Sequence, residues 1–157
     1  MKEIAYIFIG GGVGSVLRYL AQISINERMS GIGFPFSWGT FIVNIAGSLL
    51  IGLFYSVSER WNLSMEMRLF LTTGLCGGFT TFSTFSNDGL SSLPALRSWE
   101  RQYGLCGGFT TFSTFSNDGL SLLRGEFYGT FLLYALLSIG LGLVAVLAGG
   151  AIGKLLG

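Results

Sequence analysis

The sequence predicts an all-α membrane protein with four transmembrane helices, the third of which is broken. Half of the 157 residues are hydrophobic, only 11% are charged, and the mean hydropathy is +0.64. Such a composition is typical of a chain embedded in a bilayer rather than of a soluble domain. We therefore expect a single membrane domain over residues 1–157 that is not an enzyme. The formal net charge of +1 and the thin spread of charged side chains indicate no nucleic-acid partner.

Four segments have the length and apolar character of a membrane-crossing helix, which needs about 20 residues. Their expected bounds are residues 4–25, 38–58, 67–88 and 127–153. The first segment is too long for a signal-peptide core and contains Arg18, so we expect a retained span. Gly31 and Pro35 favour a turn after the first span, and charged residues with Asn62 favour a turn after the second.

The string GLCGGFTTFSTFSNDGL occurs twice, at residues 74–90 and 104–120. Removing residues 91–120 would leave four regular spans, so we interpret that segment as an inserted duplicate that links the third and fourth helices. The first copy follows an apolar stretch, whereas the second follows Arg97, Glu100 and Arg101, which are costly inside a bilayer. We therefore expect the first copy to form the third span.

Two other arrangements of the duplicate remain open. The second copy could occupy the span while the first is looped out, or it could cross as a fifth span and place the termini on opposite sides. An engineered and a natural origin of the insertion are both compatible with the sequence. Cys76 and Cys106 fall at equivalent places in the two copies, so they predict neither a disulfide nor a metal site. We expect Cys76 to be shielded and Cys106 to be reachable by a water-borne reagent.

The repeated block places glycines in the middle of the third span. Gly74, Gly77 and Gly78 predict a helix break, and the freed carbonyls must find another partner at that depth. Unwound helices in membrane transporters coordinate sodium through backbone oxygens, so carbonyls near Gly77 and Thr80 are candidate cation ligands. A plain glycine kink is the alternative interpretation.

Aromatic and hydroxyl side chains alternate just after this break. Phe82 and Phe85 lie three residues apart, among Ser83 and Thr84, and therefore share neighbouring parts of one helical face. Because the edge of an aromatic ring is positive, such rings can hold a small anion weakly. Core packing is the alternative for these residues.

Polar residues four positions apart indicate polar faces on the second and fourth spans. Asn44 and Ser48 form one such pair, and Tyr134 and Ser138 form the other. These side chains could line a pathway or make interhelical hydrogen bonds. Arg18 could attract anions, hold a helix end, or simply snorkel toward water.

Four strings carry a resemblance to a known family. They are GGGVGSVLRY at 10–19, GTFIVNIAGSLLIG at 39–52, GLCGGFTTFSTFS at 74–86 and YALLSIGLG at 134–142. In this order they resemble the Fluc (CrcB-type) family of bacterial fluoride channels. The resemblance covers the chain except for about thirty residues between Leu90 and Ser121. It implies a passive channel that exports fluoride across the bacterial inner membrane.

The resemblance also implies a fold and a set of site residues. The fold is an antiparallel, dual-topology homodimer of four-helix subunits in the lipid bilayer, with a structural sodium ion at its centre. The carbonyls of Gly77 and Thr80 correspond to the sodium ligands. Pore residues correspond to Asn44, Phe82, Phe85, Tyr134 and Ser138, and Asp88 to an acid that follows the motif. The second copy holds the counterparts Gly107, Thr110, Phe112 and Phe115.

The distribution of basic residues is consistent with insertion in both orientations. With four spans, one side carries Lys2, Arg60, Arg68 and Lys154, and the other carries Arg28, Arg97, Arg101 and Arg124. Equal numbers give no preferred orientation.

Two further function classes were weighed against a fluoride channel. A small proton-coupled exporter is disfavoured, because no Asp or Glu is expected inside a span. A non-conducting or conformationally switched variant of the channel scaffold is the remaining alternative.

Overall fold

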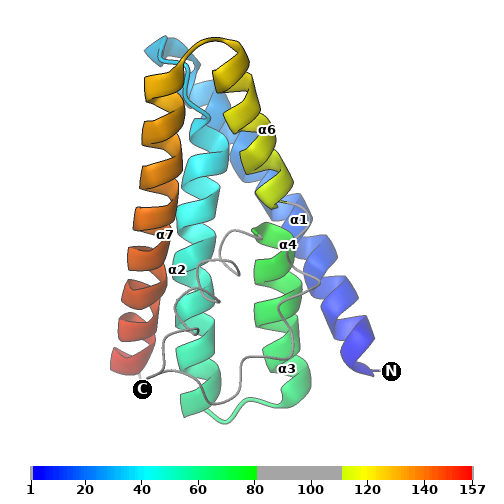
Figure 1. The fold of residues 1–157 in the computed structure, drawn as a ribbon. Coiled ribbons are helices and arrows are strands. Elements are labelled where there is room, and N and C mark those ends of the chain that lie inside the picture. The colour runs from blue at the N-terminus through cyan, green and yellow to red at the C-terminus, as the bar shows by residue number, and fades with distance from the viewer. Residues whose placement is uncertain (1, 81–110, 157) are drawn as a thin grey trace.

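The computed structural model describes residues 2–80 and 111–156, and every regular element in those ranges is a helix (Figure 1). The three long helices are α1 (Lys2–Met29), α2 (Trp38–Arg60) and α7 (Tyr128–Leu155). Each of the three is long and apolar enough to cross a bilayer. The prediction of an all-α membrane protein is therefore confirmed, with three spans of membrane length in the described part of the chain.

The long helices lie over three of the expected segments and extend past their C-terminal bounds. α1 continues past Ile25 to Met29 and is followed by the 3-10 turn η1 (Ser30–Ile32). The expected bounds followed the apolar stretch, whereas a helix can continue through polar residues once it leaves the hydrocarbon. At 1.5 Å per residue, α1 is about 42 Å long, close to the thickness of a bilayer with its headgroups. Gly33, with φ +66°, adopts the left-handed conformation that ends η1.

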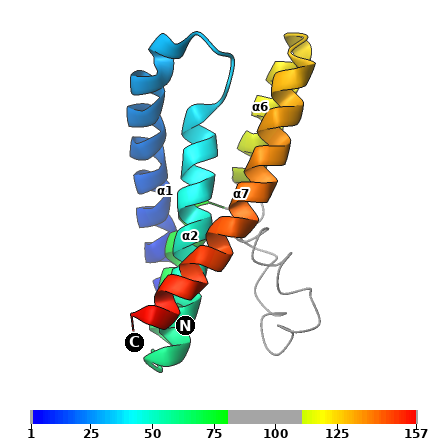
Figure 2. The ribbon, with the colours of Figure 1, turned by 90° about the vertical axis from the view of Figure 1, so that its left-hand side faces the viewer.

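α2 and α7 form the most extensive helix pair. They run side by side in Figure 1, and Figure 2 shows that α7 crosses the lower part of α2 at an angle and diverges from it toward the other end. Small residues allow this close approach: a Cβ at Gly52 would overlap the Val146 carbonyl, and one at Gly149 would overlap the Leu49 carbonyl. At the end of the pair, the Arg60 Nη1 donates to the Lys154 carbonyl at 2.9 Å. The two helices therefore form a rigid support for the polar residues that they carry.

A shorter helical run follows α2 and packs against α1. It consists of α3 (Met65–Leu69), the π-helical turn η2 (Phe70–Cys76) and α4 (Gly77–Phe79). Ser64 caps its start, because the Ser64 hydroxyl accepts a hydrogen bond from the Met67 amide at 3.3 Å. Thr80 ends the run with an extended backbone, at φ −157° and ψ 131°. The run is about 22 Å long, which is too short to cross the hydrocarbon alone.

The second copy of the block contributes a helix of its own, α6 (Thr111–Arg124). Sequence analysis interpreted residues 91–120 as a linker, but the structure has residues 111–120 within α6. The expected third span, residues 67–88, has its first part in α3, η2 and α4, and residues 81–88 lie outside the described ranges. α6 packs against α7 and α2. It is about 21 Å long, so it too is only half a span.

The short helices occupy opposite halves of the bundle. In Figure 1, α3 and α4 lie beside the lower half of α2, and α6 lies in the upper half. α1 begins and α7 ends at the lower end, where the connection from α2 to α3 also lies (Figure 1).

Candidate functional site

A hydrogen bond between α2 and the end of α4 lies at the centre of the site. The Thr80 hydroxyl donates to the Asn44 Oδ1 at 2.9 Å, and both residues are 0% exposed. Gly47, one turn along α2 from Asn44, makes room for Thr80, because a Cβ there would overlap the Thr80 methyl group. The absence of a side chain at Gly47 thus brings Asn44 and Thr80 within bonding distance.

Several fully buried polar atoms near this hydrogen bond have no hydrogen-bond partner among the described residues. All belong to residues that are 0% exposed, and they are Asn44 Nδ2, Ser48 Oγ, Tyr134 OH and Ser138 Oγ. An unpaired polar group in a protein interior costs about 1–3 kcal/mol, so a cluster of them usually faces water or a ligand. Sequence analysis paired Ser48 with Asn44 but left it out of the pore residues. The four-residue spacing is the signal that identifies it.

Tyr134 lies between two aromatic rings. The Phe115 ring of α6 stacks on it at 5.1 Å and 27°, and the Phe36 ring meets it edge-on at 5.3 Å and 89°. Phe112 lies 6.1 Å from Phe115 and is 46% exposed. Sequence analysis did not identify Phe36, because it lies in a connection, where no helical periodicity marks it.

The predicted pore residues of the first copy lie outside the described ranges. These residues are Phe82, Ser83, Thr84 and Phe85, and the same holds for Gly107 and Thr110 of the second copy. The structure brings together Asn44, Tyr134 and Ser138 as buried polar residues of α2 and α7. Phe115, a second-copy counterpart, is the block residue that contacts Tyr134 in the described structure.

The end of α4 exposes backbone oxygens to other partners. The Thr80 amide donates to the Cys76 carbonyl at 2.7 Å, and the extended Thr80 backbone then stops the helix. The last carbonyls of a helix lack intrahelical donors. One of them, the Gly78 carbonyl, accepts from the Ser15 hydroxyl at 3.5 Å. Among the described residues, no group of three or more His, Cys, Asp or Glu side chains is placed to hold a metal ion.

Two charged residues approach the site from α1 and α6. Arg18 lies one turn beyond Gly14, on the face of α1 that contacts η2 and α4, and its Nε is buried without a partner in the described ranges. Asp118 is the acceptor nearest to hand for the Tyr134 hydroxyl, but the two groups do not meet hydrogen-bond geometry in this structure. The Asp118 Oδ2 is also buried, and the described residues offer it no hydrogen-bond partner. Asp118 belongs to α6, which is not among the helices long enough to cross a membrane alone.

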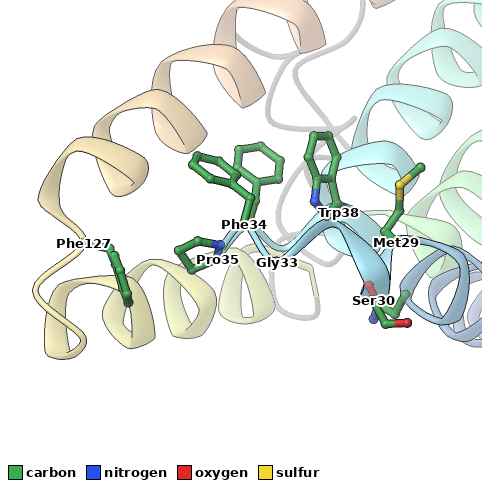
Figure 3. Close-up of a pocket in the computed structure, with 9 residues that line it drawn as sticks. Met29, Ser30, Gly33, Phe34, Pro35, Trp38 and Phe127 are labelled. Carbon is green, nitrogen blue, oxygen red and sulfur yellow. The ribbon is translucent and has the colours of Figure 1, made fainter.

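A cavity of about 410 Å³ lies at the end of the bundle near the α1–α2 connection. Figure 3 shows its wall built from Met29 of α1, Ser30 of η1, Phe34 and Pro35 of the connection, Trp38 of α2 and Phe127 before α7. Phe36 also lines the cavity and contacts Tyr134. This one residue therefore connects the cavity wall to the buried polar residues.

Buried polar groups inside a bundle of membrane-length apolar helices define a multi-pass α-helical membrane protein with an internal polar site. The sequence profile of the CrcB-like protein, Camphor Resistance (CrcB) family matches residues 5–103 and again residues 93–150. The chain belongs to this family. Its members are membrane channels and not enzymes.

Relatives with the name fluoride-specific ion channel FluC support the assignment. The relative from Bacteroides fragilis is 57% identical over 154 residues, which is 98% of each chain. The relative from Phocaeicola vulgatus is 58% identical over 93 residues, covering 59% of this chain and 74% of its own. That from Flavobacterium psychrophilum is 52% identical over 94 residues, covering 59% and 73%.

The lengths of these matches bear on the duplicated segment. The alignment with the Bacteroides fragilis relative covers 98% of both chains, so that relative has nearly the same length as this chain. The extra residues are therefore not peculiar to this chain. The two separate matches to the family profile each contain one copy of the repeated block.

Proposed function

We propose that this chain forms a fluoride-selective passive channel that exports fluoride across the bacterial inner membrane. The observation that carries the proposal is the row of fully buried, unpartnered polar atoms on Asn44, Ser48, Tyr134 and Ser138 in the described structure. The names of the relatives identify fluoride as the ion. The small-exporter alternative is set aside, because the family is one of channels.

The chemistry of these groups suits a small anion. The Asn44 amide nitrogen and the Tyr134 and Ser138 hydroxyls can each donate a hydrogen bond to fluoride. Neighbouring rings can direct positive edges at the ion without the tight hold of a fixed charge. Weak, multiple contacts of this type favour rapid passage, because binding is strong enough to admit an ion and weak enough to release it.

The working unit in this proposal is an antiparallel homodimer with dual topology. Large apolar side chains on α1 and α7 are exposed in the single chain, including Phe8 at 80% and Leu136 at 63%. Such surface suits contact with lipid or with a second copy. The half-exposed Phe112 ring would then be covered by the partner. The balance of basic residues supports insertion in either orientation.

A structural sodium ion at the dimer centre completes the proposal. The carbonyls of Gly77 and Thr80 would hold it, where α4 ends and the backbone becomes extended. Sodium is a hard cation and accepts oxygen ligands of this kind. Replacing sodium with N-methylglucamine should lower both thermal stability and fluoride efflux, and adding sodium back should restore them. Equal stability and efflux with and without sodium would exclude this part of the proposal.

A non-conducting variant of the channel scaffold is the second candidate. It is favoured by one observation. Thirty residues separate Thr80, at the end of α4, from Thr111, at the start of α6. A break at that point could misplace the pathway while leaving the helices intact.

Ion efflux from liposomes separates the two candidates. The purified chain is reconstituted in vesicles loaded with fluoride or with chloride, and efflux is followed with ion-selective electrodes. We expect fluoride efflux well above that of protein-free vesicles and chloride efflux at the background level. Ser138→Ala should slow fluoride efflux. Ser121→Ala, which removes an exposed hydroxyl from α6, should leave the rate of fluoride efflux unchanged. Fluoride efflux equal to that of protein-free vesicles would support the non-conducting scaffold.

A further inference from the structure

We propose that the third span of this channel is assembled from both copies of the repeated block. The first copy supplies the half that ends at Thr80, and the second copy supplies the half that begins at Thr111. Phe112 and Phe115, rather than Phe82 and Phe85, are then the rings beside the pathway. The claim that α6 belongs to the third span is argued from its contacts in the structure. The claim that Phe112 and Phe115 line the ion pathway rests on the proposed function.

The helical run of the first copy ends at Thr80, where the backbone becomes extended, and α6 carries the second copy from Thr111 onward. GLCGGFT of the first copy and TFSTFSNDGL of the second together make up the repeated string once. Because the two copies are identical, this match does not favour one join over another, and the proposal rests on the contacts of α6.

Contacts of α6 place the second copy beside the buried polar residues. Phe115 stacks on Tyr134 at 5.1 Å. Asp118, one turn further along α6, lies close to the Tyr134 hydroxyl. Leu122, one more turn along, is buried at 7% exposure. One face of α6 therefore packs inward over three consecutive turns, as a helix of the bundle does and a surface linker does not.

The lengths of the two halves also fit one span. Each half is about 21–22 Å long, so neither crosses the hydrocarbon of about 30 Å alone. In Figure 1 the two pieces lie in opposite halves of the bundle, and Figure 2 shows α6 beside α7. Their summed length is greater than the thickness of the hydrocarbon.

The competing arrangement uses residues 74–90 as one continuous segment. It is attractive because it leaves Arg97, Glu100 and Arg101 in a connection between two helices, away from the hydrocarbon. The local sequence beside Tyr134 is the same in both arrangements, since Phe85 and Phe115 occupy equivalent positions. Only an experiment that labels one copy at a time separates them.

Cross-linking to Tyr134 tests the packing without any measurement of transport. In a background with Cys76→Ala and Cys106→Ala, Tyr134→Cys is combined with either Phe115→Cys or Phe85→Cys. The full chain in membranes is treated with a short, membrane-permeant bis-alkylating reagent, and intact mass reports the internal cross-link. We expect the pair at 115 and 134 to cross-link and the matched pair at 85 and 134 to keep two separately modified thiols. Cross-linking of the 85 pair, alone or to the same extent as the 115 pair, would overturn the proposal.

Single-copy substitutions provide a second readout that leaves Tyr134 in place. Phe115→Ile should slow fluoride efflux by about tenfold more than Phe85→Ile does, a difference of about 1.4 kcal/mol in barrier height. The reverse order, or equal effects, would contradict the assignment of the second copy. If the unmodified chain does not conduct, the proposed function fails, and the cross-linking result still decides which copy packs on α7.

Discussion

At the scale of single residues, the hydrogen bond from Thr80 to Asn44 depends on the glycine at position 47. The bond is 2.9 Å long and fully buried, and the Thr80 methyl group occupies the space where a Cβ of residue 47 would be. Packing and hydrogen bonding at this point are therefore coupled. A change at either residue should alter the effect of a change at the other.

A double-mutant cycle tests this coupling. Gly47→Ala alone should destabilise the protein by about 1–3 kcal/mol, because the new methyl group overlaps Thr80. Thr80→Ser removes the Thr80 methyl and keeps the hydroxyl, so in the Gly47→Ala background it should recover part of that loss. Thermal unfolding in detergent measures all four proteins. Strictly additive effects of the two substitutions would show that the side chains do not meet.

Some site residues could be predicted from the sequence and others could not. Asn44, Tyr134 and Ser138 were predicted, because polar residues four positions apart on an apolar helix share a face. Their roles in conduction stay predictions. Phe36 could not be found in this way, since a connection has no periodicity. The residues that precede each copy favoured Phe85 over Phe115, whereas the described contact with Tyr134 is made by Phe115.

At the scale of elements, α1 packs on the third-helix region through close backbone contact. Gly10 and Gly14 are buried and lie against η2 and α4. A Cβ at Gly10 would be 2.7 Å from the Phe70 carbonyl oxygen, and one at Gly14 would be 2.7 Å from the Phe79 amide nitrogen. Gly12, on the other face of α1, has no such neighbour within 4 Å. The two faces of one helix thus offer a matched comparison.

Alanine substitutions at these glycines should have opposite effects. Gly14→Ala should lower the free energy of unfolding by about 1–3 kcal/mol, because rigid backbone cannot move away from the added methyl. Gly12→Ala should be neutral or raise it by up to about 1 kcal/mol, since alanine is the better helix former. Thermal unfolding and the elution profile of the purified protein measure both. Equal behaviour of the two variants would contradict the packing of α1 described above.

The three long helices could be predicted from length and hydropathy, and the third-helix region could be predicted only in part. Its two described pieces, ending at Phe79 and beginning at Thr111, are each shorter than the length that identifies a span. Removing residues 81–110 leaves the same string as removing residues 91–120. No pattern in the sequence therefore shows where the chain departs from the span.

At the scale of the whole molecule, we predict that the thirty extra residues are dispensable, because their removal leaves one complete copy of the repeated block. Deletion of residues 81–110 joins Thr80 directly to Thr111 and restores a continuous block. We expect the shortened chain to fold, and to conduct fluoride at least as fast as the full chain. Efflux from liposomes at matched protein density measures this. Loss of expression or of fluoride efflux would show that the extra segment has a role that the fold does not reveal.

Orientation in the membrane is a second property of the whole chain. Arg97 and Arg101 belong to the extra segment, and they contribute to the equal numbers of basic residues in the arrangement where residues 91–120 connect the third and fourth spans. Replacing both with Ala should bias insertion toward the orientation that places Lys2 and Lys154 in the cytoplasm. The matched Arg97→Lys and Arg101→Lys variant should keep both orientations. Accessibility of a cysteine added at the C-terminus, probed from each side, measures the ratio. An unchanged ratio in the alanine variant would contradict dual topology set by these charges.

The central claim is that the buried, unpartnered polar atoms of the described site serve a passing anion rather than the fold. Tyr134→Phe tests it most directly, because it removes one hydroxyl and keeps the ring between Phe36 and Phe115. The measurement is fluoride efflux together with thermal unfolding of the same protein. We predict slower efflux and a free energy of unfolding that is unchanged or higher, since an unpaired buried hydroxyl costs about 1–3 kcal/mol. Unchanged efflux with a clear loss of stability would mean that the hydroxyl is a structural hydrogen-bond partner, and it would contradict the account.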